Sequence, residues 1–275
     1  MADRVRFDID AGDVTLAADH WPGDGPSLVL LHAGITDRRS WYEVAERLAG
    51  VGDIVAYDRR GFGDTPLGAG AFSDAADVRA ALQALGDEPR WLVGNSMGGA
   101  LALGAALRRP ERVAGLVLIG TAMNGWPEEL FELDDATLQL EQRVERAERS
   151  RDVDELASAA AWLWLDGPTQ PEGRVAGAPR SLFAAMVRGV TRHDDGTDRG
   201  ENEADVWSQL GCIDVPALVL CGEYDTPLLK PLTEASRLMP RAEFRCMPGT
   251  AHLPMLDQPE QTAMLIAGFI REHPT

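Results

Sequence analysis

The stretch Leu92-Val-Gly-Asn-Ser-Met-Gly-Gly-Ala-Leu101 places Ser96 between glycines, where an apolar run ends and an Ala/Leu-rich run begins. This G-x-S-x-G pattern predicts a sharp strand–turn–helix connection. Gly94 and Gly98 leave room for the turn, which lifts the serine hydroxyl clear of a sheet. The helix expected from Met97 onward adds backbone N–H groups and a positive dipole end beside the serine. The stretch therefore predicts an exposed serine nucleophile.

A serine nucleophile needs a histidine base and an acid that orients the histidine. Pro216–Gly222 is an apolar run that predicts a buried strand, and Asp225 follows it closely. Ala242–Met247 predicts the next strand, and His252 lies in the loop after it. The carboxyl ends of parallel strands meet at one edge of a sheet. We therefore expect Asp225 as the acid and His252 as the base beside Ser96.

Other residues compete less well for these two roles. His32 is the main competitor of His252, but it precedes the serine, whereas the superfamily that this elbow resembles has the order serine, acid, histidine. Asp214 and Asp257 lie near the predicted strands, but neither sits in the turn just after one. The loop Thr121–Gly125 follows the first apolar run after the elbow, and it contains no carboxylate that could serve as the acid. The order and spacing favour Asp225 and His252.

With these segments in this order, the chain resembles the α/β-hydrolase superfamily over nearly its whole length. Leu28–Gly34 is similar to the family's strand that ends in a His-Gly turn, although Ala33 stands where glycine is usual. Asp58–Gly63 is similar to its D-x-R-G-x-G loop. The resemblance implies a mostly parallel eight-stranded sheet flanked by helices, with an inserted helical lid. The implied boundaries are residues 1–121 and 207–275 for the core and 122–206 for the lid.

Residues 122–206 show apolar positions at helical spacing, which predict three helices. The three sets are Leu140, Val144 and Ala147, then Leu156, Ala160 and Trp164, then Leu182, Met186 and Val190. Glu145 and Arg149 are spaced to pair on another face of the first helix. Such stripes favour packing of the lid on the core over contact with a substrate.

The resemblance implies a serine hydrolase that forms an acyl-enzyme on Ser96 and requires neither a metal nor an organic cofactor. Backbone N–H groups of Met97 and Gly34 are the expected oxyanion donors. The expected substrate is a carboxylic ester or lactone of a small to medium, largely apolar molecule. Four residues near the predicted site are candidates for an apolar substrate pocket, and ordinary core packing explains them equally well: Met123, Trp126, Trp162 and Trp164.

Two other interpretations of the same motifs stay open. The elbow with Asn95 is similar to that of the meta-cleavage-product hydrolases, which use the same triad to break a carbon–carbon bond in vinylogous diketones. Those relatives usually carry an aromatic residue directly after the catalytic histidine, where this chain has Leu253. The other interpretation is a non-catalytic protein that binds a ligand under the lid. A haloalkane dehalogenase is disfavoured, because its elbow nucleophile is an aspartate and Ser96 is not.

Composition agrees with an enzyme that acts on a small molecule. The 275 residues carry a formal net charge of −18, which argues against nucleic acid or an anionic membrane as a partner. An apolar content of 45% can fill one α/β core plus an insertion. No apolar run approaches membrane-spanning length and no signal-peptide pattern follows Met1, so we expect a cytoplasmic protein. The sequence leaves the oligomeric state open.

The cysteines point to neither a metal site nor a disulfide framework. Cys212, Cys221 and Cys246 form an odd set without metal-ligand spacing, and two of them fall in predicted strands. We therefore expect buried free thiols.

Overall fold

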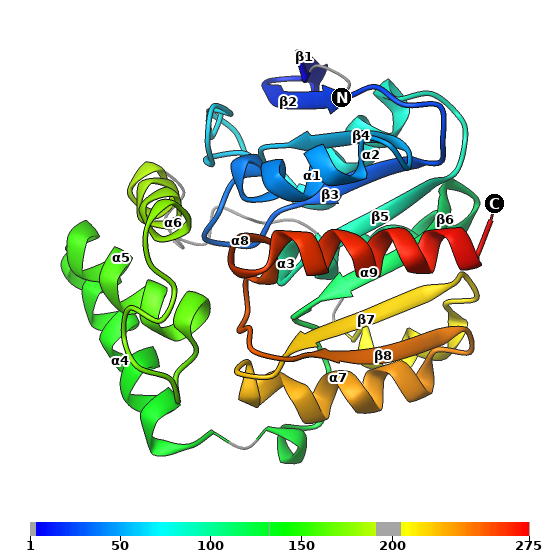
Figure 1. Cartoon of the computed structure of the whole chain (residues 1–275). Coiled ribbons are helices and arrows are strands. Elements are labelled where there is room, and N and C mark those ends of the chain that lie inside the picture. Colours follow the sequence, from blue (N-terminus) through cyan, green and yellow to red (C-terminus); the bar gives the residue numbers. More distant parts are fainter. Residues whose placement is uncertain (1–3, 132, 191–204, 275) are drawn as a thin grey trace.

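The computed structural model describes residues 4–131, 133–190 and 205–274. An eight-stranded sheet has the order β1-β2-β4-β3-β5-β6-β7-β8 (Figure 1). β2 runs antiparallel to β1 and β4, and the other neighbouring pairs are parallel. The strands are β1 (Val5–Asp10), β2 (Thr15–Trp21), β3 (Ser27–Leu31), β4 (Asp53–Tyr57), β5 (Arg90–Asn95), β6 (Val113–Ile119), β7 (Ala217–Gly222) and β8 (Ala242–Met247). The predicted α/β architecture is confirmed.

The central strands are apolar because both faces of the sheet are covered. All six residues of β5 and all six of β7 are buried. Such strands are near-continuous runs of Val, Leu and small residues and do not alternate with polar positions. β7 begins one residue later than the predicted strand, and β8 has the predicted limits.

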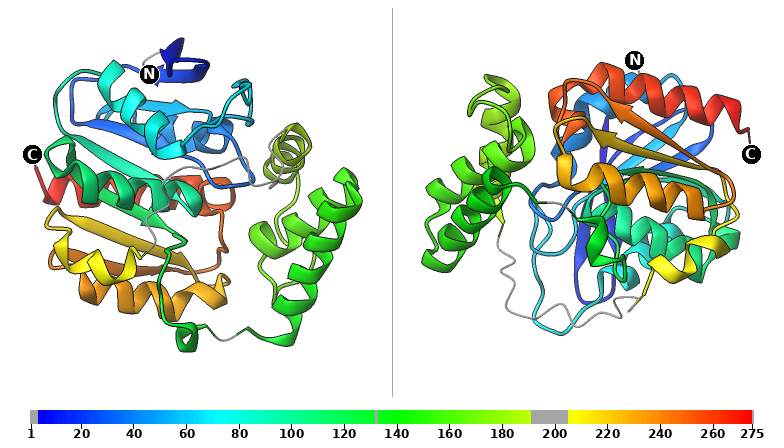
Figure 2. Two further views of the ribbon diagram at one scale, coloured as in Figure 1. Left: turned by 180° about the vertical axis from the view of Figure 1, so that it is seen from behind. Right: turned by 90° about the horizontal axis from the view of Figure 1, so that it is seen from below.

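Helices pack on both faces of the sheet (Figures 1 and 2). α1 (Tyr42–Leu48) and α9 (Pro259–Glu272) contribute to the apolar cluster on one face. α2 (Asp74–Ala84), α3 (Met97–Arg108) and α7 (Thr226–Leu238) contribute to the cluster on the other. Each large side chain buried in these clusters contributes about 1.5–3 kcal/mol to the stability of the folded state. This double cover holds the strand ends in fixed positions.

Between β6 and β7 the chain forms the insertion, residues 135–189, which projects from the core in both views of Figure 2. Its elements are α4 (Asp135–Ser150), α5 (Val153–Ala160), a π-helix (Ala161–Asp166) and α6 (Ala178–Gly189). The first and third predicted helices correspond to α4 and α6, although Val190 is the C-cap residue that follows α6. The second differs, because α5 ends at Ala160 and Trp164 lies in the π-helix.

Short elements complete the chain. They are η1 (Arg38–Trp41), η2 (Pro110–Arg112), η3 (Glu128–Leu130), η5 (Trp207–Cys212) and α8 (Pro254–Asp257). The predicted pair on α4 is present, with Arg149 and Glu145 3.5 Å apart. The predicted lid segment, 122–206, includes residues 191–204, which lie outside the described residues, so its limits stay a prediction.

The prediction of buried thiols is wrong for two of the three cysteines. Cys221 in β7 is buried, and burial raises the pKa of its thiol well above the ordinary value. Cys246 is exposed because β8 is the edge strand of the sheet, and Cys212 is exposed in the short helix η5. A strand pattern therefore predicted extended backbone correctly but did not predict burial at an edge.

Within residues 4–131, 133–190 and 205–274, no group of three or more His, Cys, Asp or Glu side chains is arranged to hold a metal ion. Over the same described ranges, no helix combines the length and the apolar composition needed to cross a membrane.

Candidate active site

Ser96 occupies the turn between β5 and α3 in a conformation that few non-glycine residues adopt. Its φ is 53° and its ψ is −116°, and such strain costs about 1–3 kcal/mol. The Ser96 N–H donates to the Ile119 carbonyl at 2.8 Å, which fixes the turn on β6. A Cβ atom at Gly94 would come within 2.3 Å of the Gly98 oxygen, and one at Gly98 within 2.1 Å of the Leu31 oxygen. The turn therefore needs glycine at both predicted positions.

The predicted acid and base are hydrogen-bonded to each other. His252 Nδ1 lies 2.8 Å from Asp225 Oδ2, and each residue is 8% exposed. Asp225 precedes α7 at the end of β7, and His252 lies in the loop between β8 and α8. An ionised carboxylate can only accept, so Nδ1 donates, and a neutral imidazole that donates from Nδ1 has Nε2 as its acceptor.

Asn95 connects the elbow with this pair. Its side-chain Nδ2 donates to the Ile119 carbonyl and to the His252 carbonyl, each at 3.0 Å. A Cβ atom at Gly120 would lie 2.8 Å from His252 Nδ1 and 3.1 Å from Asp225 Oδ2. The strand ends of β5 and β6 therefore touch the acid–base pair. The structure brings the three residues of the predicted triad to one place, while their catalytic roles stay a prediction.

The loops that carry the acid and the base are also bonded to each other. The Tyr224 N–H donates to the Thr250 carbonyl at 2.9 Å, and the Gly249 N–H donates to Glu223 Oε2 at 2.9 Å. A third bond comes from the insertion, where the Trp164 carbonyl accepts from the backbone N–H of His252 at 3.1 Å. The position of the histidine thus depends on the insertion as well as on the sheet.

The two predicted oxyanion donors lie side by side. The Ala33 carbonyl accepts from His32 Nδ1 at 2.8 Å and from Arg59 Nη2 at 3.0 Å. In a trans peptide the N–H points opposite to the C=O, so the N–H of Gly34 points away from these donors. A Cβ atom at Gly34 would lie 3.9 Å from the Met97 Cβ. Met97 is the first residue of α3, where backbone N–H groups have no acceptor within the helix.

His32, the competitor for the role of base, has both ring nitrogens engaged. The backbone N–H of Arg59 donates to His32 Nε2 at 3.0 Å, so the ring proton is on Nδ1 and is donated to the Ala33 carbonyl. The ring is fully buried and makes a T-shaped contact with the Phe62 ring at a centroid distance of 5.1 Å. His32 is therefore a structural residue of the Gly34 turn. Sequence reasoning missed the support from Arg59, although it identified the loop that contains it.

An ion-pair cluster around the buried Arg38 fixes the next part of the same loop. The backbone N–H of Arg38 donates to Asp58 Oδ1 at 2.8 Å, and the Arg38 guanidinium contacts the other carboxylate oxygen. Arg38 Nε also bonds Asp19 Oδ2 at 2.6 Å, and Nη2 bonds Asp64 Oδ2 at 2.9 Å. Burial raises the pKa of Asp58 to about 6, although the charge of Arg38 opposes the shift. These four residues form the core arginine cluster.

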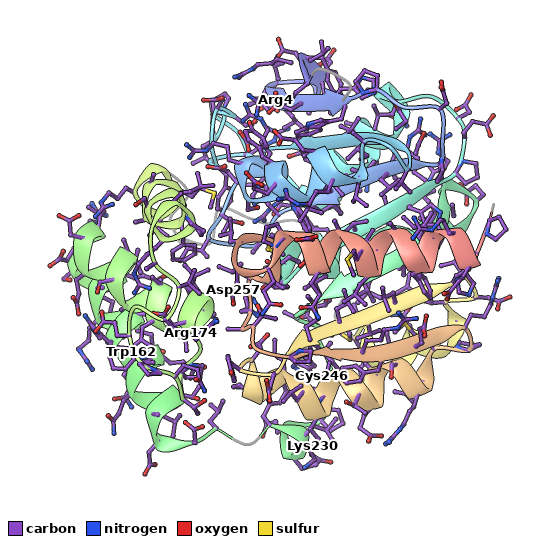
Figure 3. All side chains as sticks on the ribbon, in the orientation of Figure 1. Arg4, Trp162, Arg174, Lys230, Cys246 and Asp257 are labelled. Carbon is purple, nitrogen blue, oxygen red and sulfur yellow. The ribbon has the colours of Figure 1, made fainter. Side chains whose placement is uncertain are left out.

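The four predicted substrate residues have different surroundings. Met123 is 4% exposed and packs in the apolar cluster with α2, α3 and α7. Trp126 is half-buried, with the Phe131 ring against it edge to face at 4.4 Å. Trp162 lies within the insertion (Figure 3), and its Nε1 donates to the Gln170 carbonyl at 2.8 Å. Trp164 is the member of this set whose backbone bonds His252.

A separate cleft of about 440 Å³ lies within the insertion, lined by α5, the π-helix, α6 and the loop between the last two. Its charged groups pair with one another or with the insertion beneath it. Arg188 bonds Asp154 at 2.8 Å, and Arg180 bonds the buried Asp166 at 2.8 Å. The lining contains none of the residues of the predicted triad.

Known proteins resemble this chain along most of its length. The model of the alpha/beta hydrolase family matches residues 28–265. A 2-hydroxymuconate semialdehyde hydrolase of Pseudomonas putida is 30% identical over 80% of this chain and 77% of its own. The carboxylesterase YbfK of Bacillus subtilis (strain 168) is 24% identical over 90% of this chain and 81% of its own. A thermophilic esterase from Thermogutta terrifontis has a TM-score of 0.77 and 25% identity, covering 99% of this chain and 100% of that one.

These relatives are hydrolases. The residues that the family model matches, 28–265, include the elbow, Asp225, His252 and the Gly34 turn. The prediction of an α/β-hydrolase is therefore confirmed, and the chain belongs to the alpha/beta hydrolase family.

Proposed function

We propose that the protein is a serine hydrolase that cleaves a carboxylic ester or lactone of a small to medium, largely apolar molecule. The observation that carries the proposal is the 2.8 Å bond between His252 Nδ1 and Asp225 Oδ2 beside an elbow serine with a positive φ. This arrangement supplies an activated nucleophile, and the relatives named as esterases support the choice of an ester.

The first half of the reaction follows from what each group can do. His252 Nε2 removes the Ser96 hydroxyl proton as the serine oxygen attacks the carbonyl carbon of the ester. Asp225 holds the histidine in the required tautomer and stabilises its protonated form. The N–H groups of Met97 and Gly34 donate to the tetrahedral oxyanion, and each such donor contributes about 2.7–4 kcal/mol. Collapse expels the alcohol, which takes the proton from His252 and leaves an acyl group on Ser96.

Water completes the cycle by the reverse sequence of proton transfers. His252 removes a proton from the water as the water oxygen attacks the acyl carbon, and it returns this proton to the Ser96 oxygen when the acid leaves. With a lactone, the alcohol stays attached to the acyl group, and one hydroxy acid is released. The reaction balances without a metal, a redox partner or an organic cofactor.

The apolar character of the substrate rests on residues beside the serine. Met97 follows Ser96 directly and is 41% exposed, so an apolar side chain borders the serine at the surface. We propose that Met97 and Trp164 line the acyl pocket, with the insertion as its lid. Met123, Trp126 and Trp162 are weaker candidates because packing or a backbone carbonyl already accounts for their positions.

The test is hydrolysis of p-nitrophenyl esters of increasing acyl length by the wild-type protein, Ser96→Ala and Asp225→Asn. We expect Ser96→Ala to lower kcat by roughly 10⁶ and Asp225→Asn by roughly 10⁴. Both variants should keep the far-ultraviolet circular dichroism of the wild type. The acyl length with the highest kcat/KM measures the pocket. Turnover that survives in Ser96→Ala would contradict the proposal.

Carbon–carbon bond hydrolysis is the second candidate. Asn95 favours it, because the elbow is similar to that of the meta-cleavage-product hydrolases, and so does the Pseudomonas putida relative. Leu253 is buried after His252, where those enzymes usually carry an aromatic residue. A vinylogous diketone that is cleaved faster than any ester would make this the main activity. Binding of either substrate without turnover, unchanged in Ser96→Ala, would identify a ligand-binding protein instead.

A further inference from the structure

Arg174 lies where the insertion meets the core, opposite Asp257 of α8 (Figure 3). It belongs to the loop between the π-helix and α6, and its guanidinium bonds four acceptors. Nε donates to the Asp166 carbonyl at 2.7 Å, and Nη2 donates to the Leu165 carbonyl at 2.8 Å. Nη1 donates to the Gly249 carbonyl at 2.9 Å, and Nη2 bonds Asp257 Oδ2 at 2.6 Å. Arg174 and these partners form the junction cluster.

The acceptors outside the insertion flank the predicted base, Gly249 in the loop of His252 and Asp257 at the end of α8. Gly249 comes three residues before His252, and Asp257 comes five residues after it. The guanidinium carbon of Arg174 also lies 5.1 Å from the centroid of the Tyr224 ring, and Tyr224 directly precedes Asp225. One side chain of the insertion therefore contacts both loops that hold the acid–base pair.

The backbone of Arg174 is itself held in place. Asp166 is fully buried, and its carboxylate accepts from the N–H of Gly173 at 2.8 Å and from the N–H of Val175 at 2.8 Å. Arg180 Nη1 bonds the same carboxylate at 2.8 and 2.9 Å. Since the residues on both sides of Arg174 are anchored, the backbone of Arg174 is fixed independently of the guanidinium contacts. The planar guanidinium also loses less side-chain entropy per hydrogen bond than a lysine ammonium would. The arginine is pre-organised toward the core.

The N–H donors of the Arg174 guanidinium bind groups of the protein and not a substrate. Four of the five N–H donors of an arginine side chain have acceptors here, and one acceptor is a carboxylate that neutralises the charge. The side chain is 20% exposed and that of Asp257 is 11% exposed. An anionic substrate group would have to displace Asp257 to bind. A contact that positions the loops explains all four bonds.

We propose that Arg174 is a positioning residue that holds the loop of His252 against the insertion, so that the His252–Asp225 bond keeps its geometry only while the insertion is docked. The π-helix contributes the Trp164 carbonyl, which accepts from the N–H of His252, and Arg174 caps the carbonyls at the end of that helix. The inference rests on the proposed function of Ser96, His252 and Asp225. It makes the insertion a part of the proton-transfer machinery as well as a cover.

The kinetic test uses Arg174→Lys, with Arg143→Lys as the matched control. Lysine keeps the charge and most of the stem but cannot reach four acceptors in different directions. Arg143 lies on α4 and pairs with Glu155 at 2.5 Å inside the insertion, so its variant changes an ion pair without touching the core. With a p-nitrophenyl ester, we expect kcat of Arg174→Lys to fall about 10- to 100-fold with little change in KM. Arg143→Lys should match the wild type.

A spectroscopic test needs no turnover. In protein labelled with ¹⁵N-histidine, the Nδ1 proton of His252 should give a downfield resonance in the wild type, because it is donated to Asp225. We expect this resonance to broaden or disappear in Arg174→Lys and to persist in Arg143→Lys. Asp257→Asn, which keeps the shape of the side chain but removes its charge, should show a smaller change and serves if Arg174→Lys does not fold.

The outcomes separate this inference from the proposed function. Wild-type kcat together with a wild-type His252 resonance in Arg174→Lys would overturn the inference. A raised KM with unchanged kcat would also overturn it, because Arg174 would then bind substrate. A wild-type protein that neither turns over esters nor reacts with a fluorophosphonate at Ser96 would count against the proposed function. In that case, the His252 resonance alone still supports or overturns the link between Arg174 and the His252–Asp225 bond.

Discussion

Two arginines support the predicted site from opposite sides of β5, and they use different partners. Arg38 follows the predicted oxyanion turn and bonds three carboxylates, those of Asp19, Asp58 and Asp64. Arg174 bonds three backbone carbonyls and one carboxylate. The Arg38 side chain is 4% exposed and the Arg174 side chain 20%. The core arginine cluster thus consists of charged groups, which are buried except for the exposed Asp64, whereas three of the four acceptors in the junction cluster are neutral carbonyls.

The different partners of Arg38 and Arg174 predict which of the two clusters can separate in the folded protein. A buried carboxylate that loses its partner pays a large desolvation penalty, so the core arginine cluster cannot separate without unfolding its surroundings. On the core side, Arg174 bonds only the carbonyl of the half-buried Gly249 and the carboxylate of Asp257. A partly exposed carbonyl can exchange an arginine for water at a small cost in free energy. We therefore expect the turn around Gly34 to be a fixed part of the site. The junction is the place where the insertion can separate from the core.

The largest effect is expected from Arg38→Met. The change leaves the buried carboxylate of Asp58 without its cation and removes the nearer of the two cations of Asp19, which keeps Arg4 at 4.0 Å. The free energy of unfolding at pH 8 should therefore fall by about 3–5 kcal/mol. Burial already raises the pKa of Asp58 to about 6, and loss of Arg38 raises this pKa further. A raised folded-state pKa gives stability that is present at low pH and is lost as pH rises through it. The deficit should therefore be smaller at pH 5.5 than at pH 8.

Urea unfolding followed by tryptophan fluorescence at the two pH values measures both parts of this prediction. Arg47→Met is the matched control, because Arg47 pairs with Glu43 on the surface of the neighbouring α1. Its stability should stay close to that of the wild type. The contrast between the two clusters would not hold if Arg38→Met lost no more unfolding free energy than Arg47→Met. It would also not hold if the loss were the same at both pH values.

An intermediate effect is expected at the junction. A double-mutant cycle with Arg174→Ala and Asp257→Ala should give a coupling free energy of about 1–2 kcal/mol, because the pair is partly exposed. Arg174→Ala alone should cost more than Asp257→Ala alone, since it also leaves three carbonyls without their donor. Thermal or urea unfolding of the four proteins measures the cycle. A coupling of zero would show that the ion pair adds nothing to the carbonyl bonds.

Sequence patterns predicted those parts of the site that depend on local order. Apolar runs end just before Ser96 and Asp225, and the run before His252 ends a few residues earlier. Parallel strands bring such ends together, so short-range spacing was sufficient to predict that these side chains meet. The D-x-R-G-x-G loop was recognised as a motif, but the bond from Arg59 to the Ala33 carbonyl could not be deduced from it.

The junction cluster had no comparable signal in the sequence. Arg174 lies 75 residues from Gly249 and 83 residues from Asp257, and three of its four acceptors are carbonyls that every residue possesses. The π-helix was missed for a related reason, because apolar spacing does not distinguish its hydrogen bonds from those of an α-helix. Cys246 was misjudged because its exposure depends on which strand forms the edge of the sheet.

The smallest effect is expected from Arg188→Ala. Arg188 bonds Asp154 at 2.8 Å across the insertion, but these side chains are 48% and 78% exposed. In such a pair, the loss of side-chain freedom and screening by salt offset the attraction, so neither the unfolding midpoint nor kcat/KM should change measurably, with or without 0.5 M NaCl. Arg188→Ala alters an arginine ion pair of the insertion that does not reach the core, so it separates an effect on the insertion alone from an effect at the junction cluster. If Arg188→Ala lowered kcat as much as Arg174→Lys, general loosening of the insertion would explain both results. An unchanged kcat in Arg188→Ala beside a lowered kcat in Arg174→Lys would instead locate the effect at the junction cluster.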